Sequence, residues 1–189
     1  KRRSLALLLV IVPFWTNSLV RIYGWMILLR SQGVVNALLI ALGVIDTPLK
    51  LLYNFGAVLV GMVYALLPFM ILSVYNSISK LDPSLTEAAR DLGAGKWRAF
   101  WSVTVPMTRA GIMAGCVLVF IPSVGLFFIS DLLGGAKTML LGTLIKNELL
   151  TARNWPMGAA LSVVMMAATL LVIGLYQKLS GEKSLEGIV

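Results

Sequence analysis

The sequence contains no histidine and only one cysteine, Cys116. Without histidine, the chain lacks the commonest metal ligand in proteins and the side chain that most often performs acid–base catalysis near neutral pH. A lone cysteine forms neither an internal disulfide nor a thiolate metal site, both of which need a second cysteine. Metal binding and catalysis through imidazole are therefore excluded, and we expect no metal site in this chain.

Charged residues are also scarce, at 13% of the 189 residues, whereas soluble domains carry roughly a quarter. Hydrophobic residues make up 59%, and the mean hydropathy is +0.91. A soluble core of this length would not bury so much apolar surface, so we expect membrane lipid to be the solvent. The net charge of +8 is scattered between apolar stretches. Nucleic acid, which requires a continuous basic face, is not an expected partner.

Long uncharged stretches predict the membrane spans, because a helix needs about 20 residues to cross the hydrocarbon layer. The sequence offers four of them: Ser4–Val20 with an extension past Arg21 to Met26, Leu51–Ser79, Ala110–Ser130 and Asn154–Gln177. The uncharged stretch Ser31–Ile45 is shorter and predicts an interfacial or re-entrant helix. The expected fold is therefore an all-α polytopic membrane protein, with residues 1–189 forming one transmembrane domain.

The distribution of Lys and Arg predicts the orientation. Four crossings place both visible ends on the same side as segment 80–109, and this side holds ten Lys and Arg residues against five on the other. Positive charge is enriched in cytoplasmic loops. We therefore expect both visible ends and segment 80–109 to be cytoplasmic.

Pairs of small residues one helical turn apart occur in two of the predicted spans. They are Ala57 with Gly61 and Gly111 with Gly115. Small residues at this spacing allow two helices to approach closely in a membrane. We expect both pairs to lie at helix–helix contacts.

Segment 80–109 is larger than a simple connection requires. Asp82 and Pro83 are typical of a helix start, with Asp82 as the cap and Pro83 in the first turn. The expected order is a helix over Thr86–Leu92, a break at Gly93–Gly95, and a second helix over Lys96–Val105 that stops before Pro106.

A spaced motif occupies this segment: Glu87-Ala88-Ala89, then Gly93, then Val103-x-Val105-Pro106. The motif resembles the EAA loop of ABC importer permeases, in which the loop docks into a groove of the cytoplasmic ATPase. Small Ala88 and Ala89 suit close docking, and Gly93 allows a turn that a Cβ would oppose. Glu87 near a helix N-terminus complements the helix dipole. The resemblance implies that residues 80–108 form the coupling loop, through Glu87, Ala88, Ala89, Gly93 and Pro106.

Other segments resemble the permeases of bacterial spermidine/putrescine importers, within the MetI-like, binding-protein-dependent transport family. These segments are Val12–Gly24, Leu42–Pro48, Ser130–Lys137 and Arg153–Pro156. The resemblance implies a type I importer transmembrane domain in the bacterial inner membrane, which acts as a pore-forming subunit and is not an enzyme. Such permeases have six spans, so four would be visible here and two would precede Lys1.

The same resemblance implies the partners. They are a dimer of cytoplasmic ABC ATPases, a second related permease and a periplasmic polyamine-binding protein. The ATPase would bind ATP and Mg, and we expect no cofactor on this chain. Gly93-Ala94-Gly95-Lys96 ends like a phosphate-binding loop, but Arg90 and Trp97 stand where that motif needs Gly and Ser or Thr.

Two alternatives stay open. One is an importer for another small solute, such as an amino acid, sulfate or ferric ion. The other is a secondary transporter, which would show inverted repeats and charged residues near the midplane. A secondary transporter gives no reason for a docking loop of this size.

Four residues are candidates for the substrate pathway. Trp15 offers an aromatic face, which attracts organic ammonium groups by roughly 0.5–2 kcal/mol, and Asn17 follows on the same predicted helix. Arg21 is a charge in a predicted span and would face a partner or water, or extend to the outer interface. Asp131 ends the third span and would attract an entering cation, or pair with Lys137.

Overall fold

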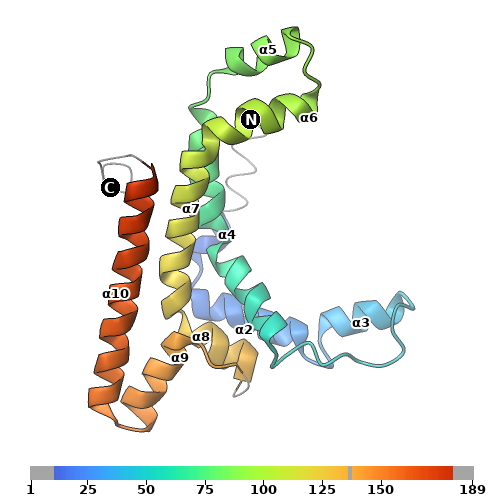
Figure 1. Cartoon of the computed structure of the whole chain (residues 1–189). Helices are drawn as coiled ribbons and strands as arrows, with labels where there is room; N and C mark the ends of the chain where they lie inside the picture. The colour runs from blue at the N-terminus through green and yellow to red at the C-terminus, as the bar shows by residue number, and fades with distance from the viewer. Residues whose placement is uncertain (1–10, 136–137, 181–189) are drawn as a thin grey trace. The chain divides into compact units, whose positions relative to one another are not determined.

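The computed structural model describes residues 11–135 and 138–180, and within these ranges every regular element is a helix. The chain divides into two compact units. Unit 1 contains residues 11–68 and 122–165, and unit 2 contains residues 69–121 and 166–180. Three long helices pass from one unit into the other: α4 (Phe55–Ser79), α7 (Val105–Gly125) and α10 (Trp155–Ser180) (Figure 1).

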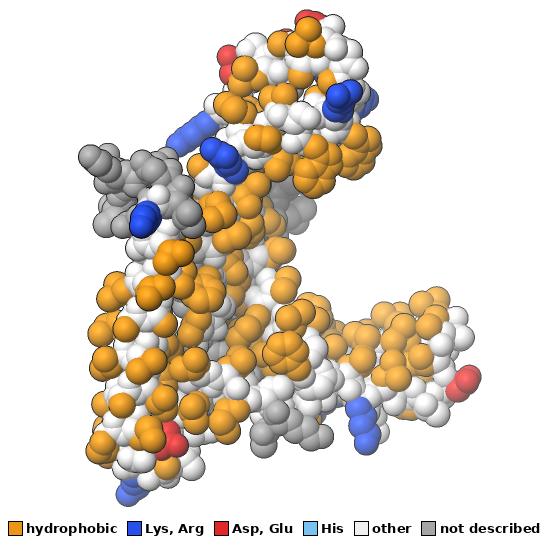
Figure 2. All heavy atoms as spheres, viewed as in Figure 1, with side chains coloured by type: hydrophobic (Ala, Val, Ile, Leu, Met, Phe, Trp, Pro, Cys, Tyr) orange, Lys and Arg blue, Asp and Glu red, His pale blue; other side chains and the backbone are white. Residues whose placement is uncertain are grey.

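Four helical segments of the described chain are long and apolar enough to cross a membrane. They are Ser18–Ala41, Phe55–Ser79, Lys96–Gly125 and Trp155–Tyr176. Large apolar side chains along α10 are exposed, Leu170 and Leu171 among them, and hydrophobic atoms cover the visible side of this helix in Figure 2. A helix that exposes so much apolar surface belongs in lipid or against another apolar surface. The prediction of an all-α protein with four visible spans is confirmed.

Unit 1 is built from short helices around the first half of α4. Its further elements are η1 (Val12–Trp15), α2 (Ser18–Leu29), α3 (Val34–Ala41), α8 (Phe127–Ile129), η3 (Ser130–Gly134), α9 (Leu141–Lys146) and η5 (Asn147–Thr151). The core forms where α2, α4 and η3 meet, around the buried residues Ile22, Val58 and Leu133. A Cβ on Gly61 would overlap the Leu133 side chain. The predicted close packing at Ala57 and Gly61 is confirmed.

The first predicted span, Ser4–Val20 with its extension to Met26, is wrong in two respects. Its described part is not a continuous helix, and the candidate span begins at Ser18 and runs to Ala41. The 3₁₀ turn η1 ends at Trp15, Thr16 is extended, and α2 begins at Ser18. Asn17 is the N-cap of α2, and its Oδ1 accepts a hydrogen bond from the Leu19 amide at 2.8 Å. Asparagine favours this position because its side chain satisfies an amide that the new helix leaves free. Residues 4–10 of the predicted span lie outside the described residues.

A buried asparagine fixes the segment after α2. The stretch Ser31–Ile45 contains the short helix α3. The sequence predicted a separate interfacial or re-entrant helix here, but the candidate span Ser18–Ala41 includes α3. Asn36 on α3 is 1% exposed. Its Nδ2 donates to the carbonyl oxygens of Arg30 at 3.2 Å and Leu49 at 2.9 Å, and its Oδ1 accepts from the Leu49 amide at 2.9 Å. One side chain therefore ties α3 to the chain on both sides of it.

Unit 2 contains the remaining parts of α4, α7 and α10, together with α5 (Pro83–Asp91), α6 (Lys96–Ala99) and η2 (Phe100–Thr104). Here α4 and α7 pack closely. A Cβ on Gly111 would overlap Ser77, and one on Gly115 would lie 2.6 Å from the Met70 sulfur. The Ser73 hydroxyl donates to the Gly111 carbonyl oxygen at 2.8 Å. The predicted contact at Gly111 and Gly115 is confirmed.

The predicted helix stop before Pro106 is wrong. Helical structure continues from α6 through η2 into α7, and Pro106 lies in the first turn of α7. Proline breaks an ordinary helix because it lacks the amide that bonds four residues back. However, η2 is a π-helical turn, in which the Val105 amide bonds the Phe100 carbonyl oxygen. Hydrogen bonds span five residues in such a turn, and the altered pattern accommodates the missing amide of Pro106.

Candidate functional site

The predicted coupling motif begins on a capped helix, α5. Asp82 is its N-cap, and one carboxylate oxygen accepts a hydrogen bond from the Ser84 amide at 2.9 Å. This backbone hydrogen bond holds the pKa of the exposed Asp82 carboxyl below its ordinary value. The cap therefore remains charged at neutral pH, where it also complements the helix dipole. The Asp82–Pro83 start predicted from the sequence is confirmed.

Helix α5 ends in a turn that depends on Gly93. Gly93 has a φ of +85°, in the left-handed region. Its amide donates to the Arg90 carbonyl oxygen at 2.9 Å, and the next amide, of Ala94, donates to the Ala89 carbonyl oxygen at 3.0 Å. These two bonds form the Schellman arrangement that ends many helices, for which glycine is the favoured residue. The break predicted at Gly93–Gly95 is confirmed.

The loop exposes both motif residues and large apolar side chains. Glu87 and Ala88 are exposed, and Ala89 is half-buried. Leu92 is 90% exposed, and Trp97 is 78% exposed. Figure 2 shows hydrophobic, basic and acidic side chains gathered over α5 and α6. Exposed apolar side chains of this size, within a charged segment, are typical of protein interaction surfaces.

The structure thus adds Leu92 and Trp97 to the predicted coupling residues. Their signal in the sequence was the presence of large apolar residues in a segment expected outside the membrane. Glu87, Ala88, Ala89 and Gly93 lie together on α5 and its closing turn. Pro106 does not join them, because it lies within α7.

The predicted pathway residues near the start of the described chain lie around the break before α2. Trp15 is 81% exposed. The Arg21 guanidinium carbon lies 4.8 Å from the ring centroid of Phe14 and 5.8 Å from that of Tyr64. Its Nε is buried and has no hydrogen-bond partner among the described residues. Aromatic faces therefore hold a cation at this place in unit 1.

Asp131 lies in η3 and forms an ion pair that was not predicted. Its Oδ2 accepts from the Lys146 ammonium on α9 at 2.5 Å. The two side chains are 33% and 24% exposed, respectively, and the ammonium also lies 5.9 Å from the Phe127 ring centroid. Lys137, the alternative partner expected from the sequence, lies outside the described residues.

A charge exchange tests this ion pair. Asp131→Lys and Lys146→Asp each place like charges together and should lower the thermal stability of the purified protein. The double variant restores an opposite pair and should recover most of that loss. For a partly exposed pair we expect a coupling free energy of about 1 kcal/mol. Additive losses in a double-mutant cycle of unfolding free energies would contradict the pairing.

The chain matches a known family of transport proteins over nearly its whole length. Residues 1–182 match the family described as "binding-protein-dependent transport system inner membrane component". The chain is 51% identical to the spermidine/putrescine transport system permease protein PotB of Salmonella typhimurium (strain SL1344), over 95% of this chain and 63% of that protein. It is 49% identical to the PotB protein of Haemophilus influenzae, over 94% and 62% of the two chains.

A solved structure has a similar fold. It is described as a bacterial ABC transporter involved in the import of the acidic polysaccharide alginate. The TM-score is 0.78 at 18% identity, covering 97% of this chain and 67% of that one. At this identity the likeness concerns the fold alone.

The chain has the fold of an ABC importer transmembrane domain, and its family match and four candidate spans make it a multi-pass inner-membrane protein. The chain belongs to the binding-protein-dependent transport system inner membrane component family. It spans about 63% of the length of the Salmonella typhimurium relative.

Proposed function

We propose that this chain is the pore-forming permease subunit of an ATP-driven importer for spermidine or putrescine. The observation that supports the choice of substrate is the 51% identity to a spermidine/putrescine permease over 95% of the chain. The observation that supports the importer mechanism is the capped, exposed helix α5, which presents the EAA motif.

Coupling to ATP hydrolysis passes through α5 and the turn at Gly93. The exposed Glu87 and Ala88 and the apolar Leu92 provide a surface for the ATPase. The partner ATPase dimer binds ATP and Mg and performs the hydrolysis, so this subunit has no catalytic role. Nucleotide binding biases the permease between inward-open and outward-open states, because the partner contacts the loop differently in each.

The remaining partners complete the pathway. A second related permease supplies the other half of the pore, and a periplasmic polyamine-binding protein delivers the substrate. The coupling loop and both visible ends lie in the cytoplasm, in keeping with the excess of Lys and Arg on that side.

Within unit 1, the pathway includes Trp15, Asn17, Arg21 and Asp131. The Trp15 side chain is exposed and offers its ring to an ammonium group. Arg21 over Phe14 is an internal example of the same interaction. Asp131 attracts the polycation, and Lys146 moderates that attraction. Asn17 positions Trp15 by capping α2 at the break.

Two measurements test the proposed function. A tagged full-length importer purified in detergent should carry an ATPase with it. The intact operon should restore uptake of labelled spermidine to cells that lack polyamine importers, and unlabelled amino acids or sulfate should not compete. ATPase co-purification without polyamine uptake would favour an importer for another solute. Uptake without an ATPase would favour a secondary transporter.

Substitution at Trp15 tests the aromatic contact. Trp15→Phe keeps an aromatic face and should retain much of the uptake, whereas Trp15→Leu keeps only apolar character and should lose more. A contact of about 1 kcal/mol corresponds to roughly a fivefold change in affinity or rate. Initial uptake rates are normalised to the amount of permease in the membrane. Equal normalised rates for wild type, Phe and Leu would leave Trp15 without a role in transport.

A further inference from the structure

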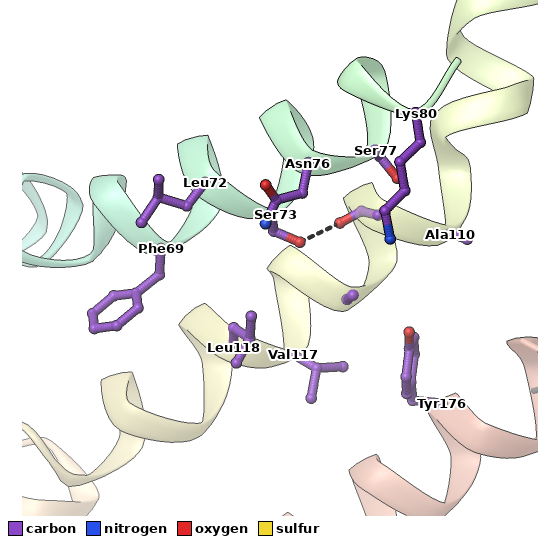
Figure 3. A pocket seen from close by; sticks show the side chains of 12 residues that line it. Phe69, Leu72, Ser73, Asn76, Ser77, Lys80, Ala110, Val117, Leu118 and Tyr176 are labelled. Carbon is purple, nitrogen blue, oxygen red and sulfur yellow. Dashed lines mark hydrogen bonds between the residues drawn. The ribbon is translucent and has the colours of Figure 1, made fainter. Parts of the chain in front are cut away.

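Unit 2 contains a groove between α4, α7 and α10 that the proposed transport function does not use. Its volume is about 400 Å³. Figure 3 shows side chains from all three helices around it, with Lys80 and Tyr176 directed into the space between them. The groove therefore has a polar end that is formed from two separate parts of the chain.

The α4 wall of the groove changes from apolar to cationic along one helix face. Its members follow one another at intervals of three and one residues: Phe69, Leu72, Ser73, Asn76, Ser77 and Lys80. Residues three or four apart lie on the same side of a helix. From Phe69 to Lys80 the helix rises by roughly 16 Å, at about 1.5 Å per residue. The ammonium thus lies at the end next to the coupling loop, and the apolar residues lie deeper in the span.

The α7 wall follows the same order. Ala110, Gly111 and Ala114 lie towards the loop and carry a small side chain or none, whereas the larger Val117 and Leu118 lie deeper. Tyr176 on α10 contributes a phenol hydroxyl to the polar end. The polar end and the apolar deep end match the two parts of a phospholipid.

The charge of the groove selects an anion. No Asp or Glu is among the described residues that line it. No described residue forms an ion pair with Lys80, and no hydrogen bond joins the Tyr176 hydroxyl to the other residues drawn in Figure 3. A polyamine would be repelled by the ammonium and would find no carboxylate. A phosphate group would instead receive charge-assisted hydrogen bonds from Lys80 and a further one from Tyr176.

We propose that this groove binds an anionic phospholipid of the inner leaflet, such as phosphatidylglycerol. Lys80 and Tyr176 hold the phosphate, and one acyl chain lies along Phe69 and Leu118. Basic sites between helices on the cytoplasmic side of a membrane bind anionic lipid headgroups. The assignment to the inner leaflet rests on the proposed cytoplasmic position of the coupling loop.

The experiment uses the full importer complex, purified in detergent and depleted of lipid. Thermal unfolding of the permease is followed during titration with phosphatidylglycerol, phosphatidylcholine or inorganic phosphate. Phosphatidylglycerol should raise the unfolding temperature at lower concentration than phosphatidylcholine, and inorganic phosphate should not reproduce the rise. Lys80→Gln should weaken the phosphatidylglycerol effect roughly tenfold in concentration, since a charge-assisted hydrogen bond is lost.

Three further variants separate lipid binding from a role in folding. Lys80→Arg should keep the lipid selectivity. Lys178→Gln removes an exposed cation of α10 that is not part of the groove and should titrate like wild type. Ala114→Leu fills the groove and should remove the selectivity while the complex stays folded in phosphatidylcholine.

Three results would overturn the proposal. Equal effects of the two lipids on the wild type would show that the groove does not select an anion, or that another segment covers it. If Lys80→Gln and Ala114→Leu both respond to the lipids as the wild type does, any lipid effect arises at another site. A response to inorganic phosphate alone would indicate an anion site without a lipid. Co-purification of the ATPase, recorded on the same samples, reports separately on the proposed transport function.

Discussion

Replacing Gly93 with valine should abolish coupled uptake while the permease still inserts into the membrane. Gly93 has a φ of +85°, and a Cβ at this position would meet no other atom within 4 Å, so the expected cost is conformational and not steric. A β-branched residue in the left-handed region costs about 1–3 kcal/mol. The turn would relax, the two hydrogen bonds from Gly93 and Ala94 would be lost, and α5 would no longer present its surface to the ATPase. We expect at least a tenfold loss of uptake and of substrate-stimulated ATP hydrolysis.

Gly95 provides a matched control within the same turn. A Cβ there also meets nothing within 4 Å, but its φ of −63° is ordinary for any residue. Gly95→Val should therefore cost only the small stability that glycine contributes at the N-cap of α6. Uptake is normalised to membrane protein levels for both variants. Equal losses at the two positions, or normal uptake by Gly93→Val, would contradict the coupling role of the left-handed turn.

Replacing Asn36 with alanine should destabilise the protein by about 3 kcal/mol. The substitution removes three hydrogen bonds and leaves the Leu49 amide without its partner, whereas the Arg30 and Leu49 carbonyl oxygens keep backbone hydrogen bonds from Gly33 and Leu51. Each buried polar group that is left unsatisfied costs roughly 1–3 kcal/mol. Asn36→Asp should destabilise the protein more than the loss of two hydrogen bonds suggests. The carboxylate would still accept a hydrogen bond from the Leu49 amide, but it would also face the carbonyl oxygens of Arg30 and Leu49, which repel it.

Thermal unfolding of the purified importer measures this effect, with limited proteolysis between α2 and α4 as a local readout. Gln32→Ala changes an exposed side chain in the same segment and serves as the control. We expect earlier unfolding and faster cleavage for both Asn36 variants and little change for Gln32→Ala. An Asn36→Ala protein as stable as the control would contradict the structural role of Asn36.

The structure of the segment from Asp82 to Gly95 was largely predictable because its determinants are local. The Asp82 cap and the left-handed turn at Gly93 depend on residues within a few positions of one another. The prediction that a helix ends before Pro106 was wrong because it assumed ordinary helical spacing. Proline ends a helix whose hydrogen bonds span four residues, and the sequence carried no sign of the π-helical turn that changes this spacing at η2.

The pathway residues show where local reasoning ends. A continuous apolar stretch does not indicate that Thr16 is extended, so the break that makes Asn17 a cap was not predicted. Similarly, Asp131 had Lys137 nearby in sequence, but the described partner is Lys146, fifteen positions away. Whether two distant charges meet depends on how η3 and α9 pack. The chemistry of each side chain was predictable, and its partner was not.

The π-helical turn η2 also fixes the rotational phase between the loop and the span that follows it. One helical residue corresponds to about 100° of rotation, at 3.6 residues per turn. The extra residue in η2 therefore offsets the side chains of α6, Trp97 among them, by about that angle relative to α7. Conversion of η2 to ordinary α-helical spacing would turn α6 about the axis of α7 and shift it by one residue. The junction therefore sets the direction in which Trp97 faces relative to the side chains of α7.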